Sequence, residues 1–291
     1  MNPNEQTIKI TSPQVDEYED IVYSQIKESW NTRELKMSLL VPRTDNLKPA
    51  ILYFPGGGFT TSNYHKFIQL RLALAKAGMV VASAQYRHIP DKFPCLIEDA
   101  KKALVYLKNN SANYHIDTNK IAVIGDSAGG YLAQLMGVTS NSTHFLPTET
   151  TAEISKVAAV VSLYGISDLS TIGGTKNPPV FHKGTSSPEA LLIHGIGAQN
   201  SSLTINDSPE KAKKASPTSY VTNNLPPFLL LHGSADTLVS PEQSQHMYEA
   251  LYKKNVDASY ITVNGAGHGT AEWYQDSIIN EIRDWLLLKL S

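Results

Sequence analysis

Residues 125–130 of this 291-residue chain read Gly-Asp-Ser-Ala-Gly-Gly and follow directly on the apolar run Ile121–Ile124. The next segment, Tyr131–Met136, can form a helix, so the motif lies at a turn from a strand into a helix. Small residues on both sides of Ser127 let two backbones approach closely, and a strained turn of this kind lifts the serine hydroxyl clear of the sheet. A Gly-rich loop that cradles a phosphate is the alternative, but it would end in Lys followed by Ser or Thr. The motif therefore favours a nucleophilic serine.

The pattern of apolar runs along the chain predicts a mostly parallel sheet with helices on both faces. Buried runs alternate with segments in which apolar residues recur three or four positions apart, which is typical of βαβ units. A helix is predicted to begin at Ser240 and Pro241, with Gln243 as its capping-box partner. Two earlier runs, near residues 21–26 and 36–41, are expected to form an antiparallel edge. The predicted buried strands are Ile51–Phe54, Met79–Ala84, Ile121–Ile124, Val157–Leu163, Phe228–Leu231 and Tyr260–Val263.

Residues 166–227 depart from this alternation. The stretch is rich in Gly, Pro, Ser and Asn, and helix starts occur only at 187–189 and 208–210, each a Ser-Pro-Glu. Connections this long in a compact domain are usually lids or binding elements. We therefore expect a single catalytic domain over residues 1–291, with a cap insertion at about 166–227.

A serine hydroxyl is a weak nucleophile at neutral pH, so the chain must also supply a base and an orienting acid. His268 lies in Gly-Ala-Gly-His-Gly, just past the predicted strand that ends at Val263. Asp236 follows the predicted strand Phe228–Leu231 and precedes a helix start. The order Ser127, Asp236, His268 is the order of α/β-hydrolase triads and differs from those of chymotrypsin-like and subtilisin-like proteases.

Other residues compete for these roles less well. Asp168 also follows a strand, and Asp257 is a weaker candidate, but strand-to-helix context and the spacing to His268 favour Asp236 as the acid. His232 sits within a strand end and lacks the glycine frame of His268, so we do not expect it to act as the base.

Composition and charge argue against several classes of partner. A net charge of -2 and a pI near 6.5 give no electrostatic reason to expect nucleic acid or an anionic membrane. Cys95 is the single cysteine, so the chain has no intramolecular disulfide and no Cys cluster for zinc, and we expect a buried thiol there. The first thirty residues are polar and acidic, and no later stretch approaches about 18 apolar residues, which predicts a cytoplasmic protein.

Several segments together resemble the α/β-hydrolase esterases related to hormone-sensitive lipase, and most closely their feruloyl-esterase-like (BD-FAE) and acetyl-xylan-esterase-like branch. The resemblance covers about Ile51 to the C-terminus and implies the α/β-hydrolase fold, with oxyanion donors at the backbone NH groups of Gly57, Gly58 and Ala128. Relatives of hormone-sensitive lipase usually carry His where Pro55 stands, which moves the assignment toward the carbohydrate-ester branch. The segments are GDSAGG, PGGGF, SAQYRHIPDKFPCLIEDAKKALVYL, HGSADTLVS, GAGHG and SSPEALLIHG.

These residues predict a serine carboxylesterase for short-chain acyl esters, with acetyl or hydroxycinnamoyl esters of carbohydrates as candidate substrates and no metal or organic cofactor. A peptidase of the prolyl-oligopeptidase kind would use the same triad but usually carries a large additional domain. A noncatalytic ligand-binding protein on this fold would normally have lost the base or the nucleophile. The oligomeric state, a homo-oligomer included, stays open. The predicted cap favours a polar alcohol because it offers Gly173, Gly174, Asn177, Pro178, Pro179, His182, Asn200 and Asn206, with one apolar cluster at Leu191–Ile193.

Overall fold

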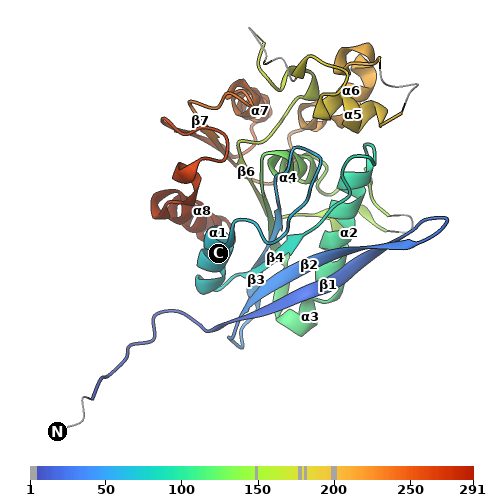
Figure 1. The fold of residues 1–291 in the computed structure, drawn as a ribbon. Coiled ribbons are helices and arrows are strands. Elements are labelled where there is room, and N and C mark those ends of the chain that lie inside the picture. The colour runs from blue at the N-terminus through green and yellow to red at the C-terminus, as the bar shows by residue number, and fades with distance from the viewer. Residues whose placement is uncertain (1–4, 148–149, 176–178, 180–181, 198–201) are drawn as a thin grey trace.

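The computed structural model describes residues 5–147, 150–175, 179, 182–197 and 202–291. Within them, eight strands form one sheet in the order β1-β2-β4-β3-β5-β6-β7-β8. β2 runs antiparallel to both β1 and β4, and all other neighbours are parallel, which confirms the predicted mostly parallel sheet with an antiparallel edge (Figure 1). The strands are β1 (Val15–Lys27), β2 (Thr32–Pro42), β3 (Lys48–Phe54), β4 (Val80–Ala84), β5 (Ile116–Asp126), β6 (Ala159–Leu163), β7 (Phe228–Gly233) and β8 (Ala258–Val263).

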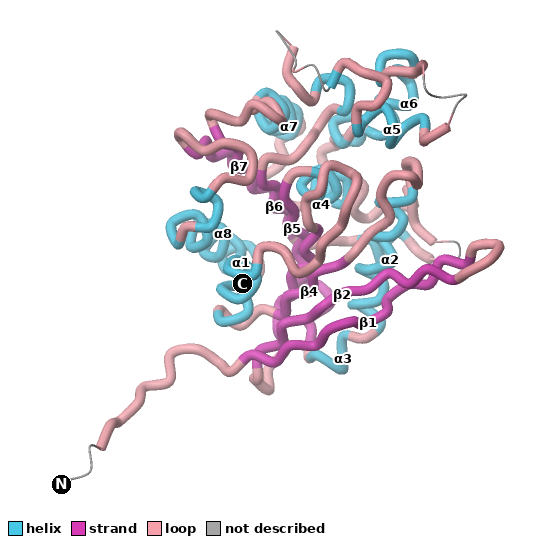
Figure 2. The backbone as a smooth tube through the Cα atoms, viewed as in Figure 1, coloured by secondary structure: helices cyan, strands magenta, loops and turns pink. Residues whose placement is uncertain are grey.

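Helices cover both faces of this sheet, as Figures 1 and 2 show. Side chains alternate along β3: Leu52 belongs to the core beneath α2, α4 and α7, whereas Ile51 and Tyr53 belong to the core beneath α1 and α8. Because both faces are covered, the central strands are mostly apolar, and each large buried aliphatic side chain contributes about 1.5–3 kcal/mol. The helices named here are α1 (Ile68–Lys76), α2 (Cys95–Asn109), α3 (Ser111–Tyr114), α4 (Ala128–Val138), α7 (Glu242–Tyr252) and α8 (Asp276–Lys289).

Two predictions about element ends are corrected by the structure. β5 begins at Ile116, five residues earlier than the apolar run, because Lys48 at the start of β3 still pairs with Ile116. The helix predicted to begin at Ser240 and Pro241, with Gln243 as capping-box partner, begins instead at Glu242 with Pro241 as its N-cap, so this prediction is wrong. The buried Gln243 side chain instead accepts hydrogen bonds from the backbone N of Ser167 and of Asp168, each at 2.8 Å, and so ties α7 to the chain that leaves β6.

The segment between β6 and β7 contains two short helices, α5 (Pro188–His194) and α6 (Pro209–Ala215), at the two predicted Ser-Pro-Glu starts. They lie side by side at the carboxyl end of the sheet in both views (Figures 1 and 2). The described residues of this segment also form the 3₁₀ turns η2 (Leu169–Thr171), η4 (Ile205–Asp207) and η5 (Pro217–Tyr220). Asn177, Pro178 and Asn200, which entered the prediction for this segment, lie outside the described residues.

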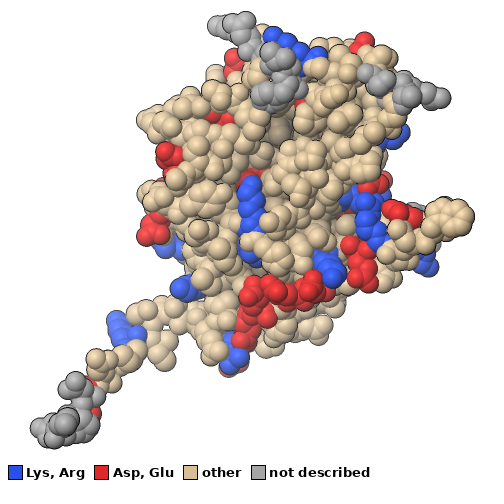
Figure 3. All heavy atoms as spheres, in the orientation of Figure 1, with Lys and Arg blue, Asp and Glu red and all other residues tan. Residues whose placement is uncertain are grey.

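β1 forms one edge of the sheet, and its acidic side chains make a band on the surface (Figure 3). Asp16, Glu17, Glu19 and Asp20 belong to this strand, and its pairing with β2 is interrupted by a register shift between Tyr18 and Ile21. In the part of the chain that the structure describes, no helix is long and apolar enough to cross a membrane.

Candidate active site

Ser127 occupies the turn between β5 and α4 in a backbone conformation that is rare for a residue with a side chain, φ 54° and ψ −121°. Its backbone N donates to the carbonyl of Leu163 at 2.9 Å, which fixes the turn against β6. A Cβ at Gly125 would lie 2.0 Å from the carbonyl oxygen of Gly129, and one at Gly129 would lie 2.0 Å from that of Phe54. Both flanking glycines are therefore required by close backbone contacts, as the sequence motif predicts.

The three residues predicted to act together lie within hydrogen-bond distance of one another. His268 Nε2 is 2.8 Å from Ser127 Oγ, and His268 Nδ1 is 2.7 Å from Asp236 Oδ2. Since an ionised carboxylate only accepts hydrogen bonds, Nδ1 carries the proton and the lone pair of Nε2 faces the serine hydroxyl. This arrangement can take the hydroxyl proton as the oxygen attacks.

Asp236 is held on both of its oxygens. Oδ1 accepts hydrogen bonds from the backbone N of Leu238 and of Val239, each at 2.9 Å, while Oδ2 faces His268. Burial alone would raise the pKa of Asp236, but hydrogen bonds from His232 and His268 outweigh it and hold the pKa well below its ordinary value. The carboxylate of Asp236 therefore stays ionised at neutral pH, where it orients His268.

His232 takes part in this site, although it is not the predicted base. The side chain is fully buried, with Nε2 3.3 Å from Asp236 Oδ2 and 3.0 Å from the carbonyl oxygen of Val239. Nδ1 lies 2.7 Å from Ser244 Oγ on α7. Ser244 can donate to Nδ1, which leaves the proton on Nε2 directed at Asp236 and Val239. The four-residue spacing from His232 to Asp236 is the one sequence signal of this contact.

The competing aspartates lie elsewhere. Asp168 caps the turn η2, where its Oδ1 accepts from the backbone N and the hydroxyl of Ser170 at 2.9 and 2.6 Å. Asp257 forms an ion pair of 2.6 Å with Lys289 of α8. Neither bonds to His268, whose Nδ1 is taken by Asp236.

The loop that carries Gly57 and Gly58 is anchored at its start. Tyr86 donates its hydroxyl to the carbonyl oxygen of Pro55 at 2.5 Å, and the backbone N of Gly56 donates to Asp126 Oδ1 at 2.8 Å. The carbonyl of Pro55 and the backbone N of Gly56 thus fix the start of the loop.

The residues predicted to supply oxyanion donors lie next to Ser127, either in the lining of its cavity or in the chain. Gly57 and Gly58 line the same cavity as Ser127 and His268, and Ala128 is the first residue of α4. Among the described residues, the NH groups of Gly57, Gly58 and Ala128 donate to no acceptor. Free amides at a helix N-terminus favour a negative charge, so an oxyanion formed beside Ser127 would find donors there.

Lys66 is a second residue of the cavity that sequence reasoning missed. Its Nζ lies 2.5 Å from Oδ2 of the fully buried Asp126, whose Oδ1 also accepts from the hydroxyl of Tyr53 at 2.6 Å. Lys66 stands in an irregular loop without a motif, so only the fold brings it to the residue that precedes Ser127.

The cavity at Ser127 has a volume of about 310 Å³. The ring of Tyr164 meets His268 edge-on with 4.8 Å between ring centroids. Cys95 is buried away from this cavity, as expected, and burial raises its pKa to about 12, so that it is protonated at neutral pH. The cavity is lined by Gly57, Gly58, Lys66, Ser127, Tyr164, Leu238, His268, Gly269 and Tyr274.

Comparisons with known proteins agree with the fold. The BD-FAE family model matches residues 37–251. Esterase LipC of Mycobacterium tuberculosis is 33% identical over 227 residues, which are 76% of this chain and 53% of LipC. The chain spans about half the length of the curated relatives it matches.

Solved structures agree as well. A truncated carbohydrate esterase from gut microbiota superposes with a TM-score of 0.78 at 26% identity, covering 96% of this chain and 99% of that one. A bifunctional GH43-CE protein of Bacteroides eggerthii gives a TM-score of 0.76 at 27% identity, over 97% of this chain and 36% of its own. The chain therefore belongs to the BD-FAE family, an esterase branch of the α/β-hydrolase fold.

Proposed function

We propose that this protein is a serine carboxylesterase in which Ser127 is the nucleophile, His268 the general base and Asp236 the orienting acid. The observation that carries the proposal is the chain of two short contacts, 2.8 Å from Ser127 Oγ to His268 Nε2 and 2.7 Å from His268 Nδ1 to Asp236 Oδ2. Relatives named esterases support the same reaction class.

In the proposed reaction His268 takes the proton of Ser127 as Oγ attacks the ester carbonyl. The amides of Gly57, Gly58 and Ala128 stabilise the oxyanion, and each such donor contributes about 3 kcal/mol to transition-state stability. His268 then protonates the departing alcohol, which leaves an acyl group on Ser127. A water molecule, activated in turn by His268, releases the acid and restores the serine.

The cavity favours short acyl groups. Among the described residues that line it, the large apolar side chains are Tyr164, Leu238 and Tyr274, which is little apolar surface for additional methylenes that would each gain about 0.8 kcal/mol on burial. We propose one catalytic domain in which residues 166–227 act as a cap over the alcohol side of the substrate. The polar character of that segment, and relatives named carbohydrate esterases, support an alcohol such as a sugar.

Alanine variants test the triad. Ser127→Ala and His268→Ala should each lower kcat for p-nitrophenyl acetate by at least about 10⁴-fold while the circular dichroism spectrum stays unchanged. The double variant should lose no more than either single one, because triad members act as a unit. A Ser127→Ala protein that kept a tenth of the wild-type rate would contradict the proposal.

A substrate panel tests the acyl and alcohol preferences. We expect kcat/KM to peak on acetyl to butyryl p-nitrophenyl esters and to fall for acyl chains beyond about eight carbons. Acetylated sugars and hydroxycinnamoyl esters locate the preferred alcohol and acid, and matched amides separate an esterase from a peptidase. Faster turnover of palmitoyl than of acetyl esters without detergent would overturn the short-chain assignment.

A further inference from the structure

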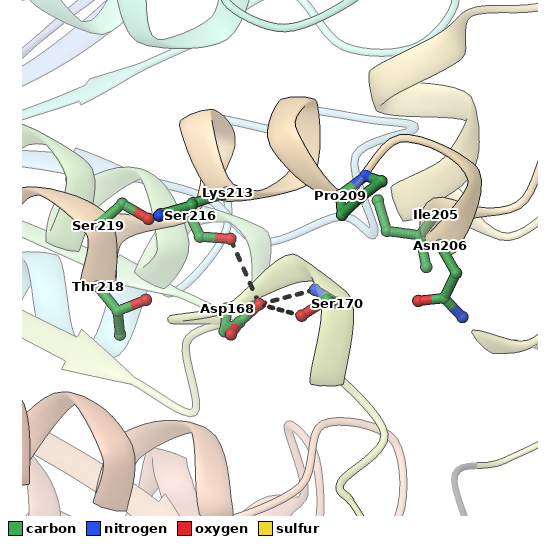
Figure 4. Close-up of a pocket in the computed structure, with 9 residues that line it drawn as sticks. All are labelled: Asp168, Ser170, Ile205, Asn206, Pro209, Lys213, Ser216, Thr218 and Ser219. Carbon is green, nitrogen blue, oxygen red and sulfur yellow. Dashed lines mark hydrogen bonds between the residues drawn. The ribbon is translucent and has the colours of Figure 1, made fainter.

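A larger cavity, of about 420 Å³, lies within the segment between β6 and β7 and apart from Ser127. Figure 4 shows Asp168, the N-cap of η2, and Ser170 of η2 below the helix α6, with Asn206 and Pro209 at one end of the space and Thr218 and Ser219 at the other. Among the described residues, the side chains of Asn206, Lys213 and Ser219 make no hydrogen bond or ion pair, so their polar groups are available to a bound molecule.

A smaller cavity of about 110 Å³ adjoins this one, and the two share Ser170, Ile205 and Asn206 in their linings. The smaller cavity is lined by Glu189 at the start of α5, whose residue surface is only 1% exposed. Oε1 of Glu189 lies 3.0 Å from His182 Nδ1, but Oε2 is buried and, in the described part of the chain, has no hydrogen-bond partner. A buried carboxylate oxygen without a donor is unfavourable, so a bound group that donates a hydrogen bond would be stabilised there.

These cavities are next to the catalytic one without being part of it. His182 Nε2 lies 2.8 Å from the carbonyl oxygen of Leu238. Leu238 lines the cavity of Ser127, His182 lines that of Glu189, and the two linings share no residue. A small ester bound at Ser127 therefore stays clear of Glu189, and the hydrogen-bonded pair of His182 and Leu238 is the point at which the two linings meet.

The lining matches the chemistry of a sugar ring. Asp168 and Glu189 can accept hydrogen bonds, Asn206 and Lys213 can donate them, and Ile205 contributes an apolar wall. A pyranose presents hydroxyls around its edge, which both donate and accept, and C–H groups on its faces. We propose that the two joined cavities form a subsite for a sugar unit of the alcohol part of the ester, an inference that rests on the proposed esterase function.

Paired substrates test the subsite kinetically. The ratio of kcat/KM for acetylated xylo-oligosaccharides to that for p-nitrophenyl acetate should fall roughly five- to tenfold in Asn206→Ala and Glu189→Gln, through KM for the oligosaccharide. Lys213→Ala should lower the same ratio. Lys214→Ala is the matched control, because Lys214 is the next residue of α6, is exposed and does not line the cavity, and it should leave both rates unchanged.

A binding measurement tests the subsite independently of catalysis. Calorimetric titration of Ser127→Ala with unacylated xylotetraose should show saturable binding that Asn206→Ala weakens and Lys214→Ala does not. An unchanged ratio in folded Asn206→Ala and Glu189→Gln, or no binding of xylotetraose, would overturn the subsite. A protein that bound xylotetraose there but hydrolysed no ester would end the esterase proposal and keep the subsite.

Discussion

Two imidazoles share one carboxylate oxygen, since both His268 Nδ1 and His232 Nε2 face Oδ2 of Asp236. The second donor fixes the carboxylate in the plane that orients His268 and stabilises its charge. Because His232 lies outside the lining of the cavity at Ser127 and contacts Asp236, it acts on the reaction through Asp236 and is a positioning residue.

Replacing His232 should therefore alter kcat more than KM. His232→Phe removes the second N–H donor, so the pKa of Asp236 rises from its lowered value and the carboxylate holds His268 in place less firmly. We expect kcat for p-nitrophenyl acetate to fall about 10- to 100-fold, with His232→Gln, which keeps a donor, retaining more activity. The measurement is kcat and KM between pH 4 and 9. A His232→Phe profile of wild-type height and shape would show that His232 only fills space.

The choice between aspartates can be tested by amide substitution. Asp236→Asn would present an N–H or a neutral oxygen to His268 and favour the wrong tautomer, with an expected loss in kcat of about 10⁴-fold. Asp168→Asn leaves that contact untouched and should cost far less. Steady-state kinetics of the two purified variants on p-nitrophenyl acetate decide the matter, and the reverse ranking would remove Asp236 from the triad.

Elements whose requirements are local could be predicted from the sequence. The central strands are mostly apolar because both faces of the sheet are covered, and the glycines around Ser127 are required by close backbone contacts. Each requirement therefore appears in the sequence as a pattern of a few consecutive residues. The contact of His232 with Asp236 left only a four-residue spacing, and the partners of Gln243 and Lys66 left no pattern. Gln243 and Lys66 each bond to a distant part of the chain, and nothing in their own neighbourhood tells which part the fold will bring close.

Helix α2 contains a buried lysine whose charge opposes folding. Lys101 is fully buried and donates to the carbonyl oxygen of Thr139 at 2.9 Å. Burial lowers its pKa to about 7, and among the charged groups Lys108 lowers it further. In the unfolded chain the amine keeps its ordinary pKa of about 10.4.

Stability should accordingly rise with pH above neutrality. Between about pH 7 and 10 the unfolded state binds a proton on Lys101 that the folded state has released, so raising the pH favours the folded state. Relative to Lys101→Met, the free energy of unfolding of the wild type should increase by about 2 kcal/mol from pH 7 to pH 9. Urea unfolding of both proteins at three pH values measures this difference, in which other titrating groups cancel. A constant difference would mean that Lys101 is charged in the fold.

At the scale of the whole molecule, the parallel sheet is what assembles the site. Ser127, Asp236 and His268 follow β5, β7 and β8, and the carboxyl ends of parallel strands lie along one edge of the sheet. Residues far apart in the chain therefore meet without any long-range sequence signal, and their order along the chain could be predicted whereas the distances between them could not.

The acidic band on β1 affects self-association of the protein. The outer side of β1 offers backbone N–H and C=O groups to any strand that approaches, and the register shift near Asp20 and the carboxylates of Glu17 and Glu19 oppose such pairing between copies. Glu17→Thr with Glu19→Thr should leave the unfolding free energy within about 0.5 kcal/mol of wild type yet lower the concentration at which light scattering detects self-association. The same threshold should fall for the wild type as salt is added, since added ions screen exposed charges. We therefore expect the acidic side chains of this one strand to limit self-association without changing the stability of the fold.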